Sequence, residues 1–389
     1  MSEDSTMASL VVPQPCREDL FSKSSPTRLL NMDKDSKCRL INAFWPHLRL
    51  TPPDLIDEEY SDFFYFLGKT LLSLYPHLEK FAARDLPDLF LDIHTLRDRR
   101  HSTKQELIPE LRQRYSDSSD SDVARSMELA VRLWLGINVC SRQLIVGPRN
   151  GRDSLVEWAD AHTLDQMVRS QFVPHQTRWS SRNSPLDDSF TVVNLKSICR
   201  LNIRWTDSLV DHLKLEGPRG HRSLTIYRHK ISLINHRKGS DSTIMPPDVL
   251  DEALRTLDLL FPFGDPKTEA FLKDEKVQFW AVAPRELPRA TETDDFHHWR
   301  NNMVALASLF NGPPETIVQT LLDTRNLPQF ATLWVAIFGV FLLTILFGIL
   351  TTVFSIKQYR IAIKSYELSL AMACQQTATP LPLFCTKLD

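Results

Sequence analysis

Glycine is scarce in this sequence: 11 of its 389 residues are glycine, which leaves few loops able to wrap backbone amides around a phosphate group. There is no G-x-x-x-x-G-K-[ST] phosphate loop, no G-x-G-x-x-G dinucleotide loop and no G-x-S-x-G nucleophile turn. Excess positive charge is missing too, since the formal net charge is −2. The sequence therefore gives no reason to expect nucleic-acid binding, and it predicts no cofactor.

Paired cysteines and glycosylation acceptors are also missing. The six cysteines lie far apart, with no C-x-x-C pair and no histidine at zinc-like spacing, so we expect reduced thiols and no metal site. No asparagine begins an N-x-S/T acceptor, and the polar, acidic start of the chain does not have the pattern of a secretory signal. These absences favour a cytosolic location for the part of the chain before residue 330.

One long apolar run stands out against this background. Phe330–Ile356 contains no charged side chain, proline or amide and is rich in Leu, Ile, Phe and Val. About 20 such residues in a helix cross the hydrocarbon core of a bilayer, whereas a buried core helix is seldom so long and so uniform. The run predicts a single transmembrane helix over 330–356, with the lipid bilayer as its first partner.

Small side chains recur along one side of this predicted helix. Thr344, Gly348 and Thr352 follow one another at four-residue steps, and Ser355 comes three residues later. Small residues let two membrane helices approach closely, so this face predicts helix packing and a homodimer formed through the span. The same residue types are frequent in membrane helices generally, which leaves a monomeric span as the alternative.

Basic side chains follow the apolar run directly. Lys357, Arg360 and Lys364 flank the membrane within 357–374, an amphipathic basic segment that either lies in the headgroup layer or continues the span into water. By the positive-inside rule these cations place the tail in the cytosol. The expected lack of a signal segment argues for the opposite orientation, and we expect the N-terminal domain to be cytosolic. The endoplasmic reticulum and the mitochondrial outer membrane remain alternatives.

The rest of the chain predicts mainly α structure with a small β element. We expect a disordered segment over 1–37, an α-rich domain over 38–309, a connection over 310–329 and a disordered tail over 375–389. Apolar residues at three- and four-residue steps predict helices within Asp57–Leu78, Leu86–Arg97, Val123–Val139, Asp153–Phe172 and Pro246–Leu260. Alternation predicts strands within Leu201–Trp205 and Ser223–Asn235.

A local motif lies beside these strands. The segment Trp205–Leu213 reads W-T-D-S-L-V-D-H-L, and the strand Leu224–Tyr227 follows it. It resembles uncharacterised filamentous-fungal proteins that carry a W-T-x-x-L-x-x-H-L segment and end in one membrane helix. The resemblance covers about Phe190 to Tyr366, and it implies an architecture but no chemistry.

Few residues qualify as candidates for chemistry. His212 beside Asp211 has the composition of a general base, and His297-His298 after two aspartates has that of a metal site, but no nucleophile or ligand spacing completes either one. We expect the acidic serine run within 116–121 to be an unmodified exposed loop, with an acidophilic kinase target as the alternative. We expect Asp120 or Ser121 to cap the helix that follows.

The sequence favours a membrane-tethered interaction or scaffold module with an unknown protein partner. A membrane-bound enzyme with an unrecognised active site, or a subunit of a membrane complex, are the alternatives. A deep pocket joining the histidine and aspartate candidates favours the enzyme.

Overall fold

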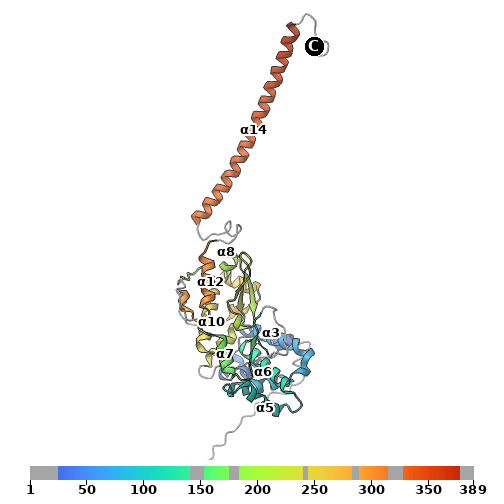
Figure 1. Ribbon diagram of the computed structural model, residues 1–389, viewed down its shortest axis with the longest axis vertical. Coiled ribbons are helices and arrows are strands. Elements are labelled where there is room, and N and C mark those ends of the chain that lie inside the picture. The colour runs from blue at the N-terminus through green and yellow to red at the C-terminus, as the bar shows by residue number, and fades with distance from the viewer. Residues whose placement is uncertain are drawn as a thin grey trace, which may run out of the picture. The chain divides into compact units, whose positions relative to one another are not determined.

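The computed structural model describes residues 25–140, 153–174, 184–239, 244–282, 289–313 and 327–376. The chain divides into two compact units, Met1–Thr316 and Ile317–Asp389. The first unit contains the short helices and all the described strands, and the second contains one long helix, labelled α14 in Figure 1. Each unit is considered separately below.

Helices make up most of the first unit. Its first α-helices are α1 (Ser25–Leu30), α2 (Lys34–Phe44), α3 (Asp57–Leu74), α4 (Leu86–Asp98), α5 (Lys104–Arg114) and α6 (Asp120–Leu135). They are followed by α7 (Leu164–Gln171), α8 (Val192–Ile198), α9 (Lys230–Lys238), α10 (Pro247–Leu260), α11 (Pro266–Asp274) and α12 (Arg300–Asn311). Short 3-10 turns lie at Pro46–Leu48, Pro52–Asp54, Tyr75–Lys80, Leu209–Asp211, Gln278–Ala281 and Thr293–Asp295.

The strands form two small sheets. β3 (Asn202–Thr206) pairs in parallel with β5 (Ser223–Tyr227), and β4 (Leu215–Glu216) pairs antiparallel on the other side of β5. β1 (Val139–Cys140) and β2 (Val156–Glu157) form a separate parallel pair. The predicted fold class, mainly α with a small β element, is confirmed.

A continuous apolar core explains why these short elements hold together. The predicted face of α3 is fully buried at Phe63, Leu67 and Leu71, and its acidic first turn suits a helix N-terminus. α4 and α5 both pack against α6. Burial of these apolar faces, at roughly 25 cal/mol per Å², stabilises helices that are too short to persist alone in water.

Two predicted elements were wrong in part, because tertiary pairing overrides the local pattern. The strand predicted over Ser223–Asn235 ends at Tyr227, where its partner β3 also ends, and Lys230–Lys238 is helical and packs on α10. The helix predicted over Asp153–Phe172 begins only at Leu164, after a capping box formed by Thr163 and Gln166. The residues before it supply β2.

Three further helices, α1, α5 and α8, were not foreseen in the sequence, and α1 lies inside the segment expected to be disordered. α5 and α8 have short apolar faces that gave no clear period. α1 begins at Ser25 and α2 at Lys34, so helical structure starts within 1–37. The residues before Ser25 and the tail from 377 lie outside the described residues.

One glycine is required by the packing between α6 and the sheet. Gly136 ends α6 in the left-handed conformation, with φ of 63°. A Cβ atom at this position would lie 2.5 Å from the hydroxyl oxygen of Tyr227, which is the last residue of β5. Any larger residue would therefore be strained in its backbone and would also clash with the sheet.

Candidate functional site

The second unit supplies the strongest functional feature, the helix α14 (Leu327–Gln376; Figure 1). Within it, Phe330–Gln375 is the one segment of the described chain that is long and apolar enough to cross a membrane. None of its most apolar window is buried against other parts of the protein. The segment therefore has the length and composition of a membrane-spanning helix.

The predicted packing face lies on α14 as an open surface. Thr344 donates a hydrogen bond from Oγ1 to the carbonyl of Val340, and Thr352 donates one to the carbonyl of Gly348, both at 2.8 Å. Nothing lies within 4 Å of the position that a Cβ atom would take at Gly348. The threonine hydroxyls are therefore satisfied within the helix, and Ser355 and the two threonines are exposed.

The basic segment continues α14 without a break. Lys357, Arg360 and Lys364 are exposed on the same helix, which runs on to Gln376. A segment lying in the headgroup plane would need a turn near Ile356, and the backbone has none there. The structure thus has the arrangement of the second alternative, a continuation of the span into water.

The cysteines differ between the two units. Cys38, in the first unit, is a buried free thiol. Cys374, near the end of α14, is disulfide-bonded. The expectation that all cysteines are reduced was therefore wrong for Cys374, because sequence spacing alone does not reveal which thiols a fold brings together.

His212 is fully committed to the packing of the first unit. Its imidazole is 1% exposed, with Nδ1 accepting from the backbone N–H of Tyr227 at 3.2 Å and Nε2 lying 2.7 Å from Oγ1 of Thr256. The Thr256 hydroxyl donates onward to the carbonyl of Ala253, so Nε2 is the donor to Thr256. Burial lowers the pKa of His212 to about 3, which keeps the ring neutral.

Asp211 performs a separate structural task. Its carboxylate is fully buried and accepts hydrogen bonds from the backbone N–H and the hydroxyl of Ser154, at 2.8 and 2.7 Å. The ammonium group of Lys214 lies 3.6 Å away. These bonds fix the chain near β2 to the turn that follows β3, so the two adjacent residues face different partners.

The His297-His298 pair is held at the start of α12 by a buried acid. The carboxylate of Glu252, on α10, accepts from the backbone N–H groups of His297, His298 and Trp299 at 2.7 to 2.9 Å. The ring nitrogens of His298 contact the carbonyl of Phe172 and the carboxylate of Asp248, each at 3.0 Å. In the described chain, no group of three or more metal-ligating side chains includes this pair.

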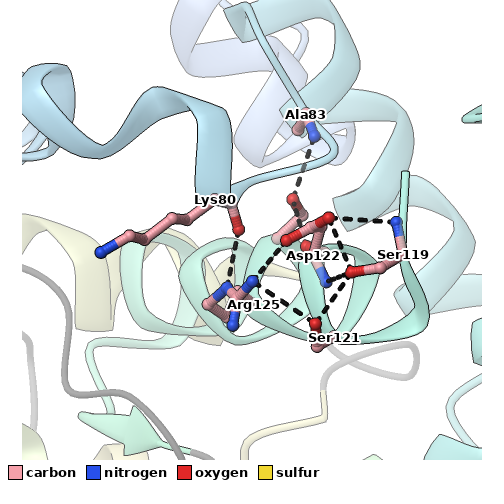
Figure 2. Close-up of polar contacts among 7 residues, drawn as sticks. Lys80, Ala83, Ser119, Ser121, Asp122 and Arg125 are labelled. Carbon is pink, nitrogen blue, oxygen red and sulfur yellow. Dashed lines mark hydrogen bonds and ion pairs between the residues drawn. The ribbon is translucent and has the colours of Figure 1, made fainter. Parts of the chain in front are cut away.

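The acidic serine run forms the cap of α6, as Figure 2 shows. Ser119 is the N-cap: it accepts from the backbone N–H of Asp122 at 3.2 Å, and the Asp122 carboxylate accepts from the Ser119 backbone at 3.0 Å. Arg125 bonds the Asp122 carboxylate and donates to the carbonyl of Lys80 at 2.7 Å. The predicted cap at Asp120 or Ser121 was wrong, since Ser119 caps the helix.

An acid–histidine pair at the ends of the parallel strands was missed in the sequence. Asp207 follows β3 and His229 follows β5, and their side chains meet at 2.8 Å, with His229 2% exposed. Burial alone would raise the pKa of Asp207, but the bond from His229 and nearby cations lower it overall. Parallel strands of equal length bring such residues together, so the pairing of β3 with β5 was the signal needed.

A shallow cleft of about 280 Å³ lies between the starts of α8 and α11. It is lined by Asp188, Thr191, Val193, Asn194, Pro262, Asp265, Lys267 and Arg289. Arg289 is already paired with Asp188 at 3.4 Å. None of the histidine or aspartate candidates for chemistry lines this cleft.

Comparison of the chain with protein-family models, curated proteins and solved structures found no match. The geometry described above therefore carries the functional argument.

A buried acid near the serine run yields a testable pH dependence. The side chain of Asp92 on α4 is fully buried. Its Oδ1 atom accepts a hydrogen bond from the Tyr115 hydroxyl at 2.9 Å and lies 3.7 Å from Nη1 of Arg114. Its Oδ2 atom has no hydrogen-bond partner. Burial raises the pKa of Asp92 to about 7, even though Tyr115 and Arg114 favour the charged form.

Between about pH 4 and 7 the folded state keeps a proton on Asp92 that the unfolded chain has released. The contribution of Asp92 to the free energy of unfolding is therefore fully present below about pH 4 and is lost as the pH rises through 7. We expect Asp92→Asn to be more stable than the native protein at pH 8 by roughly 1 to 4 kcal/mol, with the gain shrinking towards pH 4. Urea unfolding at both pH values measures this, and Asp98→Asn, at the exposed end of α4, is the control.

Proposed function

We propose that this chain is a single-pass membrane protein whose α-rich domain works as an interaction or scaffold module on the cytosolic side of the membrane. The observation that carries the proposal is the uncovered apolar helix α14. A helix of this kind inserts into a bilayer because every backbone polar group is satisfied within it, while its side chains are as apolar as the lipid. The domain before it then works at a membrane surface.

The orientation is supported by the state of the cysteines. Disulfides persist in oxidising compartments, whereas buried free thiols are typical of the reducing cytosol. Cys374 is disulfide-bonded beyond the apolar run, and Cys38 is a buried free thiol before it. This difference favours a cytosolic domain and a translocated tail, which is the orientation opposite to the one that Lys357, Arg360 and Lys364 indicate by the positive-inside rule.

The enzyme alternative has lost its support among the candidate residues. His212, Asp211 and the His297-His298 pair each have identified hydrogen-bond partners that hold backbone segments in place. None of them lines the cleft between α8 and α11. We therefore propose no reaction and look for a protein partner of the domain, including the partners expected of a complex subunit.

Membrane retention is the first test of this function. We expect the full-length protein, expressed with a tag at each end, to remain in the membrane pellet after alkaline carbonate extraction. Leu342→Arg with Ile345→Arg places two charges in the apolar run, at a cost of about 2.5 to 3.5 kcal/mol each, and should release the protein. Tyr359→Arg with Ile361→Arg, beyond the run, is the matched control and should stay in the pellet. Release of the native protein would overturn the proposal.

Protease treatment of the intact organelles then tests the orientation. We expect digestion of the N-terminal tag and protection of the C-terminal tag until detergent is added. The reverse pattern would leave the membrane anchor in place and move the domain to the opposite side.

A further inference from the structure

We propose that α14 pairs in parallel with α14 of a second copy of this chain, along one face that crosses the bilayer and continues beyond it. The inference rests on the proposed membrane anchoring and adds a specific partner, register and extent. It depends on three observations: the spacing of apolar residues along α14, a second row of small residues, and the continuity of the helix.

Apolar residues form a regular seam along the second half of α14. Counted from Thr352, the steps alternate between four and three residues, and the seam consists of Thr352, Ile356, Tyr359, Ile363, Tyr366, Leu370 and Ala373. This is the spacing of the a and d positions of a coiled coil, sustained over three heptads. A seam of this kind indicates that a second helix packs along it.

Small residues accompany the seam at a fixed interval. Gly348, Ser355, Ala362 and Ser369 are each seven residues apart, which places them in a row directly beside the seam. The row starts inside the predicted bilayer and ends well outside it, so the two environments share one interface pattern. Because the repeat is seven residues, the expected pairing is a left-handed coiled coil that draws the two backbones together along this row.

The continuity of α14 makes this one surface. The helix has no break between Leu327 and Gln376, so the membrane part and the part beyond it keep the same face. Beyond the apolar run, Tyr359 is 68% exposed and Tyr366 is 61% exposed. A helix that projects such a stripe into water is marginal when alone, and a partner along the stripe would stabilise it.

A second copy fits this face better than any other helix of the chain. α14 has 50 residues, whereas the longest helix described in the first unit, α3, has 18. The bilayer holds two identical spans at the same depth, which sets the parallel, in-register alignment. In that alignment Arg360 lies opposite Ser355 and Glu367 opposite Ala362, while Lys357 and Lys364 point away from the seam, so no like charges meet.

The test uses full-length protein with two different fluorescent tags, co-reconstituted into phosphatidylcholine vesicles and followed by energy transfer at increasing dilution in lipid. Gly348→Ile adds a bulky side chain where the two helix backbones approach each other within the bilayer. Ile363→Lys places a charge in the part of the seam that lies beyond the bilayer. The matched controls are Thr351→Ile and Ile361→Lys, because these positions lie outside the seam and the two rows that flank it. Nothing lies within 4 Å of the position that a Cβ atom would take at Gly348, so a single copy tolerates the larger side chain there.

We expect each interface variant to weaken self-association at least tenfold, about 1.4 kcal/mol, while both controls stay close to the native protein. An absence of energy transfer in the native protein, or equal losses in interface variants and controls, would overturn the inference. Loss in Gly348→Ile without loss in Ile363→Lys would overturn the extension beyond the bilayer. Carbonate resistance of the same samples reports on anchoring, so a monomeric but integral protein would contradict this inference and leave the proposed function intact.

Discussion

Glu252→Ala is expected to lower the free energy of unfolding of the first unit by roughly 2 to 5 kcal/mol, because it removes the acceptor of three backbone N–H groups at the start of α12. Glu252 is 5% exposed, and its carboxylate accepts from the N–H groups of His297, His298 and Trp299. A buried donor left without an acceptor costs about 1 to 3 kcal/mol, which applies in full to the buried Trp299 N–H and in part to the two part-buried histidine N–H groups. Urea unfolding followed by circular dichroism measures the loss.

A matched control separates the buried role from the loss of charge. Glu269 lies on α11 with a half-exposed side chain and pairs with Lys273 at 2.8 Å one helical turn away. Exposed pairs of this type contribute about 0.3 to 0.5 kcal/mol, so Glu269→Ala should be nearly neutral. If Glu252→Ala were equally mild, the N-terminus of α12 would not depend on this carboxylate.

The contacts of Glu252 also explain why the residues that the sequence offered as candidates for chemistry have structural roles instead. Glu252 and Thr256 are one turn apart on α10, so Glu252 holds the start of α12 while Thr256 bonds His212. The ring centroids of Trp299 and His212 are 5.3 Å apart, so the two segments that α10 holds also contact each other. These residues are far apart in the sequence, and their association is visible only from the packing of α10 against both segments.

Features set by local pattern were predictable, and features set by long-range pairing were not. The apolar run, the face of α3 and the start of β5 follow from side-chain period alone. The helix α9 and the strand β2 depend on partners distant in the sequence, which no window of residues contains. The Asp207–His229 pair belongs to the second group.

Lys104→Met is the second substitution expected to have a large effect. Lys104 opens α5, and its Nζ atom lies 2.7 Å from Glu128 on α6 and 3.3 Å from the carbonyl of Trp158. Both charged residues are buried, at 1% and 4% exposure. Removal of the cation leaves the Glu128 carboxylate buried without its partner, and we expect a loss of about 3 to 5 kcal/mol of stability.

The double variant Lys104→Met with Glu128→Leu shows whether the cost comes from the stranded charge. Well-packed apolar residues can replace a buried ion pair at little cost, so the double variant should recover most of the stability lost in the single one. The Trp158 ring, 5.5 Å from Nζ, can pack against the methionine side chain. If the double variant were as unstable as the single one, Lys104 would matter through its bond to the Trp158 carbonyl, since both variants lose the donor of that bond.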